Sequence, residues 1–267
     1  MFTGNYNFFD YKLNIPGYTG QDHGGLAQYL YLAISAVLLV ALLVALRKTK
    51  REKALRLIGF IGIFMTLFYI GKTSWESYYD VRLNGGFNFW LLPFDSCSLI
   101  MPAAILAGFA GGKVRDVAAA WVATGGIVGG FATMLFLNAF YYYPFLSFGA
   151  FYSMLWHFLM VFMGLLVLVS TPRNLPFSLV TKGYLFHLAA SAVVIPIDFI
   201  WNFDFMLYKD LGGIPVFEGI AASFTDRSMG WINPIMMLCL YFAAFTAVFL
   251  ITAGIRKLIH GKTEQAF

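Results

Sequence analysis

Long apolar segments separated by short polar connections occupy almost the whole chain. A helix that crosses a bilayer needs about 20 mostly apolar residues. Seven segments meet this requirement, so the pattern predicts an all-α transmembrane bundle of seven helices. The predicted spans are Leu26–Leu46, Leu57–Trp75, Phe89–Phe109, Val117–Asn138, Phe148–Ser170, Leu179–Trp201 and Trp231–Gly254.

Two of these spans contain a proline and several polar residues. Pro102 lies in the third span and Pro196 in the sixth. Proline is tolerated in membrane helices because neighbouring groups can satisfy the carbonyl that it frees. Both segments are therefore still predicted to cross the membrane.

The composition agrees with a membrane protein and excludes other classes. Of the 267 residues, 60% are hydrophobic and 12% are charged, and that charged fraction is about half that of a soluble domain. A chain this apolar does not remain disordered, and two cysteines cannot form a disulfide scaffold. The spans leave no room for a soluble domain, so residues 1–267 are predicted to be a single transmembrane domain.

Lysine and arginine are concentrated in alternate connections. Thirteen of the 18 follow the first, third, fifth and seventh spans, and the positive-inside rule places these segments in the cytoplasm. We therefore expect the tail 255–267 to be cytoplasmic, and the N-terminal segment 1–24 and the loop 202–230 to be extracellular. The start of the chain lacks the pattern of a cleavable signal peptide.

This distribution predicts a multi-pass protein of the cell membrane, such as a bacterial plasma membrane. The basic connections suit an anionic inner leaflet, and they give no reason to expect a nucleic-acid partner. The expected partners are therefore membrane lipids, with a lipid or small molecule as the substrate. The sequence does not define an oligomer partner.

Small residues recur at helix-packing spacing in the fourth span, which contains TGGIVGG. Gly125 with Gly129 and Gly126 with Gly130 form two overlapping pairs. Such pairs let membrane helices approach closely. We expect them to pack helices within one chain, and a dimer interface is the alternative.

Polar residues gather toward the predicted outer ends of five spans. Ionisable groups within a membrane are costly, so each is a candidate for a functional site. We expect these side chains to meet in a pocket open to the outer side, although a structural ion-pair network is the alternative. The candidate ligand-binding residues are Lys72, Glu76, Ser98, Asn138, Asp198 and Asn202.

Cys97 and His157 are the candidate catalytic pair, because they lie at similar predicted depth on different spans. A cysteine becomes a nucleophile when a neighbouring base favours the thiolate. Asp95, Glu76 or Asp198 could orient the imidazole, as the third member of a triad does, while Ser96 and Ser98 are rival nucleophiles. A site of this kind would suit acyl transfer or lipid ester hydrolysis.

Other chemistry has little support in the sequence. Cys97, His157 and Asp95 lack the spacing of a metal site, so neither a metal nor a cofactor is predicted. The seventh span has no lysine for a retinal Schiff base. His187 is interpreted as a core packing residue, and Asp116 as a charge that faces the dipole of the fourth helix.

Three stretches carry a resemblance to a known family: LPFDSCSL in the third span, FYSMLWHFLMVF in the fifth, and IPIDFIWNFDFML at the end of the sixth. Together they resemble the YwaF-type family of integral membrane proteins over most of the chain, the number of spans included. Relatives of that family include a vertebrate cysteine-dependent acyltransferase of ether phospholipids. The androgen-induced lipid hydrolases, which use threonine and histidine, are more distant.

The resemblance implies a nucleophile at Cys97 and a histidine at His157. The chain departs from the pattern beside the cysteine, where it has Asp95, Ser96 and Ser98 and relatives often carry a histidine or another polar residue. The identity of the nucleophile is therefore open at this stage.

Three functions remain under consideration. The first is a lipid acyltransferase or lipid hydrolase that uses the cysteine and histidine. The second is a small-molecule transporter or membrane ligand-binding protein that uses the same polar residues. The third is an accessory membrane subunit without catalysis.

Overall fold

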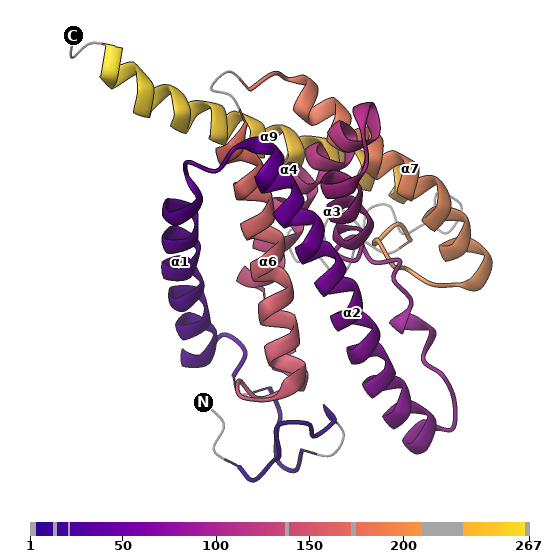
Figure 1. The fold of residues 1–267 in the computed structure, drawn as a ribbon. Coiled ribbons are helices and arrows are strands. Elements are labelled where there is room, and N and C mark those ends of the chain that lie inside the picture. The colour runs from indigo at the N-terminus through magenta and orange to yellow at the C-terminus, as the bar shows by residue number, and fades with distance from the viewer. Residues whose placement is uncertain are drawn as a thin grey trace.

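The computed structural model describes residues 4–12, 15–20, 22–136, 139–171, 175–209 and 232–264, with side chains of the last helix described as far as Lys257. Within these ranges the regular structure is helical. The longer helices are α1 (Leu26–Leu46), α2 (Arg51–Asn84), α3 (Ile100–Phe109), α4 (Gly112–Leu135), α6 (Phe148–Ser170), α7 (Ser178–Trp201) and α9 (Ile232–Glu264). A 3-10 turn, η2 (Phe89–Leu91), precedes α3, and a short helix, α5 (Ala139–Tyr142), follows α4 (Figure 1).

In the described part of the chain, six helices are long and apolar enough to cross a membrane. The bounds of α1 and α6 match the prediction, and α7 begins one residue earlier than predicted. By contrast, α2 and α9 continue well beyond their apolar segments, and α4 begins five residues early. The ends differ because polar residues continue a helix readily where it leaves the apolar region.

The predicted third span, Phe89–Phe109, is not one continuous helix. Its first part forms the turn η2 and then irregular backbone, and helix begins only at Ile100. Pro93 removes a backbone donor, and the Ser98 amide donates to the Asp95 carbonyl in a local turn (2.9 Å). The seven-helix prediction therefore overestimated the helical length of this segment.

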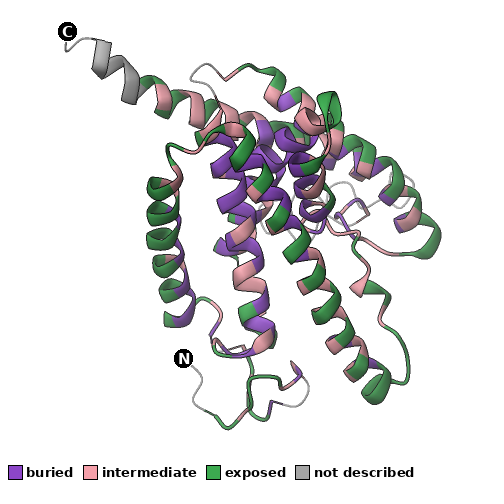
Figure 2. Ribbon diagram, viewed as in Figure 1, coloured by how far each residue is buried: buried purple, intermediate pink, exposed green. Residues whose placement is uncertain are grey.

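Helix α4 lies at the centre of the bundle and is its most enclosed element. Every residue of α4 from Ala118 to Ile127 is buried, and the helix packs against α3, α6, α7 and α9. By contrast, α1 packs mainly on α6 and exposes most of its apolar side chains (Figure 2). The protein core is therefore formed by the inner helices, whereas α1 presents a broad apolar surface.

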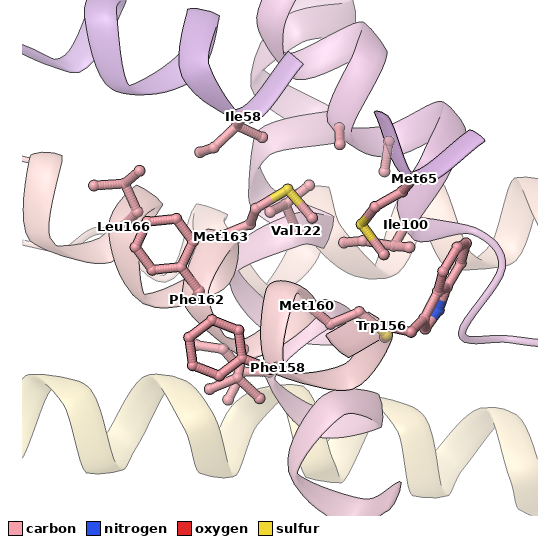
Figure 3. Packing of buried hydrophobic residues seen from close by; sticks show 14 of the residues in the cluster. Ile58, Met65, Ile100, Val122, Trp156, Phe158, Met160, Phe162, Met163 and Leu166 are labelled. Atoms are coloured by element: carbon pink, nitrogen blue, oxygen red, sulfur yellow. The ribbon is translucent and has the colours of Figure 1, made fainter. Parts of the chain in front are cut away.

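Large buried side chains of α6 fill the space between α2, α3 and α4. Met160 and Met163 of α6 are fully buried. Met163 extends toward Ile58 and Val122 (Figure 3), while Met160 lies against Gly129 and Gly130 of α4. Methionine fills irregular gaps well because it is unbranched and flexible. These contacts fix the position of α6 against the other core helices.

Glycines allow the closest helix contacts, as the sequence predicted. Added Cβ atoms at Gly126 and Gly130 of α4 would lie 3.2 Å from Ile100 and 2.6 Å from Val161, respectively. At the α2–α3 contact, a Cβ on Gly108 would lie 2.4 Å from the Cα of Gly59. The small residues therefore serve packing within one chain.

The basic connections meet at one end of the bundle. Arg115 at the start of α4 pairs with Glu52 at the start of α2 (2.8 Å), and Arg51 donates to the Thr171 hydroxyl after α6 (2.6 Å). Asp116 pairs with Lys182 of α7 at 3.6 Å. These contacts place alternate connections on one face, as the charge pattern predicted, while the side of the membrane that this face meets remains a prediction.

Asp116 does not occupy the helix terminus where the sequence analysis placed it. Because α4 begins at Gly112, Asp116 lies in the second turn, where the ion pair with Lys182 accounts for its charge. The earlier start of the helix is the reason for this difference.

The N-terminal segment covers the opposite end of the bundle. The Tyr18 hydroxyl donates to the Tyr143 carbonyl (2.8 Å), and the Phe148 amide donates to the Phe8 carbonyl (2.7 Å). Asp22 accepts a hydrogen bond from the backbone amide of Phe145 (2.8 Å). The segment before α1 is therefore an integral part of the fold.

The close α2–α3 contact predicts a strong effect of a single methyl group. Gly108→Ala places its Cβ against the backbone of Gly59, which cannot move aside cheaply, so we expect a loss of about 1–3 kcal/mol. Gly71→Ala is the matched control because nothing lies within 4 Å of the added atom, and its effect should stay within about 1 kcal/mol. Unfolding of the detergent-solubilised variants measures both, and equal stability of the two would contradict the prediction.

Candidate functional site

The irregular segment between η2 and α3 carries the candidate nucleophile. The Tyr69 hydroxyl of α2 donates to the Leu91 carbonyl at 2.5 Å, and the rings of Phe94 and Phe205 lie 5.4 Å apart. Irregular backbone at membrane depth persists only where protein encloses it or where it lines a cavity. Here α2 and the chain after α7 enclose the segment from two sides.

Cys97 is half-buried and faces polar groups from several helices. Its thiol interacts with Asp95 and the Ser98 side chain, and electrostatically with Lys72 of α2. Tyr152 of α6 also lies within electrostatic range of the thiol. The candidate nucleophile is therefore directed toward a polar cluster.

Tyr241 of α9 joins this cluster from another side. Its hydroxyl interacts with the side chain of Ser96, and electrostatically with Cys97 and Asp95. Four separate elements thus surround the thiol: the irregular segment, α2, α6 and α9. We call this group of Lys72, Glu76, Asp95, Cys97, Tyr152 and Tyr241 the thiol cluster.

The predicted convergence of Lys72, Glu76 and Asp95 is present in the structure. Lys72 and Glu76 form an ion pair along one face of α2, and the Lys72 ammonium lies 5.3 Å from the centre of the Tyr152 ring. Asp95 interacts electrostatically with Lys72 and with Asp198 of α7. The Lys72 ammonium therefore interacts with carboxylates from two elements, Glu76 of α2 and Asp95 of the irregular segment.

His157 lies deeper on α6 and is buried. Its Nδ1 is 2.8 Å from the Ser153 carbonyl oxygen, and because a carbonyl only accepts, Nδ1 carries the proton in this contact. Nε2 is then the atom available to act as a base. Among the described hydrogen bonds of His157 none reaches Cys97, so the predicted pair is not in direct contact here.

The remaining predicted ligand residues have different positions. Buried Asp198 accepts a hydrogen bond from the Phe205 amide (3.1 Å) and so also shapes the chain after α7. Asn202 is exposed, ends α7 with a left-handed φ of 58°, and bonds to Lys209. Ser98 is buried beside Cys97, while Asn138 lies outside the described residues, as does the loop 202–230 from residue 210 onward.

Asp80 is a buried polar residue that the sequence analysis overlooked. Its Oδ1 accepts hydrogen bonds from the Tyr11 hydroxyl (2.8 Å) and from Asn84 (3.2 Å). Burial, together with Asp80, raises the pKa of the Tyr11 hydroxyl, which therefore stays protonated as a donor. The repeated spacing of four residues from Lys72 through Glu76 to Asp80 was a signal that could have revealed it.

A second polar group is formed by His187, Ser191 and Tyr208, all of them buried. The Tyr208 hydroxyl is 2.5 Å from the Ser191 hydroxyl and 3.4 Å from Nε2 of His187. His187 is in the core as predicted, but it belongs to a hydrogen-bonded network rather than to apolar packing alone. Tyr208 reaches Ser191 because the chain turns back into the bundle after α7, which no local sequence pattern indicates.

A shallow groove lies elsewhere, between α7 and α9. It has a volume of about 300 Å³ and is lined mainly by apolar side chains, with Lys182 at its edge. In the residue ranges described above, no three His, Cys, Asp or Glu side chains are grouped as metal ligands. The thiol cluster is therefore the main concentration of reactive groups that the described structure offers.

The long apolar helices and the enclosed polar cluster define a multi-pass α-helical membrane protein. Within that class, the sequence model of the TMEM164 family matches residues 18–253, and the chain belongs to this family. No curated protein and no solved structure matches it. The resemblance to the YwaF-type family and its lipid enzymes is not tested by this match and stays a prediction.

The buried network at Tyr208 predicts a measurable loss of stability. Tyr208→Phe would leave His187 without a partner for Nε2, and we expect a loss of about 1–3 kcal/mol. Tyr29→Phe is the control, because Tyr29 is 65% exposed, and it should change stability little. Thermal unfolding of the solubilised proteins decides this, and equal midpoints for the two variants would argue against a stabilising network.

Proposed function

We propose that this protein is a membrane enzyme of lipid acyl chemistry, either an acyltransferase or a lipid ester hydrolase. The observation that carries the proposal is the position of Cys97 on irregular backbone, enclosed by α2, α6 and α9 and facing Lys72 and Asp95. A structural cysteine commonly packs among apolar side chains as a small hydrophobe, whereas the thiol of Cys97 lies among charged and hydroxyl groups that a reaction could use.

In the proposed reaction, Sγ of Cys97 attacks the ester carbonyl of a phospholipid. The thiol proton passes to Nε2 of His157, and the imidazolium returns it to the departing lysophospholipid oxygen. The resulting thioester is then attacked by the hydroxyl of another lysophospholipid, which completes acyl transfer, or by water, which completes hydrolysis. In this second step His157 takes the proton of the attacking hydroxyl or water and returns it to the departing Sγ of Cys97, which restores the thiol.

The side chains around the pair receive revised roles in this proposal. The Ser153 carbonyl, rather than Asp95, holds the imidazole in the required tautomer. Asp95 interacts with Lys72, so its proposed role is to keep the ammonium group beside the thiol. Cys97 and His157 come into contact when substrate binds, since catalytic hydrogen bonds often tighten only in the complex.

A membrane ligand-binding protein or transporter is the second candidate. The observation that favours it is the excess of carboxylates around Lys72, because Glu76, Asp95 and Asp198 all lie near this ammonium or near one another. A bound cation or a transported proton would balance such a cluster. This candidate needs neither Cys97 nor His157.

The first test compares variants of the proposed catalytic pair. Cys97→Ala and His157→Ala should each reduce acyl exchange and fatty-acid release at least about 100-fold, because each removes a reacting group. The measurement is mass spectrometry of a phospholipid and lysophospholipid mixture incubated with purified protein. Cys239→Ala is the control, since Cys239 is exposed, and it should retain full turnover.

Two outcomes of this test would contradict the proposal. Turnover that survives Cys97→Ala but is lost in His157→Ala would move the nucleophile to Ser96, Ser98 or water. A parent protein without turnover on any lipid of the mixture would favour the second candidate.

The proposed location is the cell membrane, with the basic face in the cytoplasm. In a chain whose two native cysteines are replaced by alanine, Asn5→Cys should react with an impermeant maleimide in intact cells. Lys48→Cys should react only after the cells are opened, because it lies in the basic connection after α1. Labelling in the reverse order would show the opposite orientation.

A further inference from the structure

Three charged side chains follow one another along a single face of α2. Lys72, Glu76 and Asp80 are each four residues apart, which places them on one face over about 12 Å. Of the three, Lys72 is the one that interacts with Cys97, and Asp80 lies nearest the end of the helix at Asn84. Toward the C-terminal end of α2, which the N-terminal segment covers, the charges therefore run positive, negative and negative.

We call Lys72, Glu76 and Asp80 the charged ladder, and its charges do not balance. Glu76 and Asp80 are buried, and Lys72 forms its ion pair with Glu76. Within the described part of the chain, Oδ1 of Asp80 accepts hydrogen bonds from the uncharged donors Tyr11 and Asn84, and its buried Oδ2 has no hydrogen-bond partner. A buried carboxylate without a counter-charge is costly, so a cationic donor that reached Asp80 would stabilise it.

The nearby cations of the described chain have other contacts. The Lys12 ammonium lies over the rings of Tyr11 and Tyr142, at 5.4 and 5.2 Å. Arg82 donates to the Tyr78 hydroxyl (2.7 Å). Neither forms an ion pair with the ladder in the described structure.

Aromatic rings border the outer part of the ladder. The ring of Trp75 lies 6.1 Å from that of Tyr143 and 5.7 Å from that of Tyr11. The Tyr143 hydroxyl is buried, faces Glu76 and Asp80, and comes near the Lys12 amide without a well-formed hydrogen bond. Aromatic faces beside carboxylates are the surroundings that attract alkylammonium groups.

We propose that the outer end of α2 binds the headgroup of a zwitterionic phospholipid, with its ammonium group at Glu76 and Asp80 and its phosphate at Lys72. In such a lipid the phosphate is bonded to the glycerol and the ammonium lies beyond it, so the order from the acyl chains outward is phosphate and then ammonium, which matches the order of positive and then negative charge along α2. One helical turn, about 5.4 Å, separates the two parts of the site. This length suits the two-carbon link between ammonium and phosphate.

Tyr11 takes the place of the ligand in the free protein. Its hydroxyl donates to Oδ1 of Asp80 (2.8 Å), and the ammonium group of a lipid would compete for the same carboxylate. The N-terminal segment therefore acts as an internal competitor of the headgroup. Removing the hydroxyl strengthens binding, whereas a purely structural cluster would only be weakened by its loss.

The inference rests on the proposed function for its substrate class, because Lys72 also faces Cys97 and would bring the ester toward the thiol. Binding itself requires no catalysis, so the test uses Cys97→Ala protein in detergent. Titration calorimetry compares dihexanoyl phosphoethanolamine with dihexanoyl phosphoglycerol. We expect the ammonium lipid to bind about tenfold more tightly, the effect of one charged hydrogen bond.

Variants of the ladder separate headgroup recognition from stability. Asp80→Asn should remove the tenfold preference, whereas Tyr11→Phe should increase affinity for the ammonium lipid several-fold. Asp116→Asn, at the opposite end of the bundle, is the matched control and should leave both affinities unchanged. Thermal unfolding of each variant confirms that it is folded, and Glu76→Gln replaces Asp80→Asn if that variant is not.

Equal affinity for the two lipids would overturn the inference, and so would weaker binding by Tyr11→Phe. Neither result would affect the acyl-transfer proposal, which depends on turnover. Conversely, the parent protein could show no acyl turnover while the ammonium lipid still binds more tightly than the glycerol lipid. That result would support the headgroup site and refute only the catalytic proposal.

Discussion

Irregular backbone cannot face lipid, because its amide and carbonyl groups would have no partners there. This constraint governs the segment between η2 and α3, where Pro93 and a local turn prevent a helix. The bundle satisfies it by surrounding the segment with α2, α9 and the chain after α7. The same enclosure brings the side chains of those elements to Cys97, so the break in the helix creates the site.

Close packing of the helices makes this enclosure possible. Glycines at the α2–α3 and α4–α6 contacts let backbones approach until even a methyl group would not fit. Without a hydrophobic driving force between helices in lipid, such contacts supply much of the association energy. The C-terminal half of α2 diverges from this packed region (Figure 1) and carries Lys72, Glu76 and Asp80, and Tyr11 of the N-terminal segment contacts Asp80 there.

The sequence predicted those parts of the fold that depend on a single pattern, either apolarity or charge. An uninterrupted apolar run fixed the ends of α1 and α6, and the charge pattern indicated that alternate connections share a face. The third span was misjudged because average apolarity outweighed the effect of Pro93 and the polar turn. The polar residues of α2 and of the irregular segment lie together as predicted, since the predicted alternation of the spans places them at a common depth.

Other parts of the site depend on tertiary structure and could not be predicted. The contact of Tyr11 with Asp80 joins residues 69 positions apart, and Tyr208 reaches Ser191 only because the chain turns back after α7. Depth alone suggested that Cys97 and His157 meet, but depth does not determine the rotation of a helix. The imidazole is directed to Ser153 on its own helix.

The central claim is that Cys97 forms a thioester with an acyl chain during turnover. The most direct test is mass spectrometry of the peptide containing Cys97 after brief incubation of the protein with phospholipid. The account predicts an added acyl mass on this cysteine that neutral hydroxylamine removes. An unmodified Cys97 in protein that is actively exchanging acyl chains would contradict it.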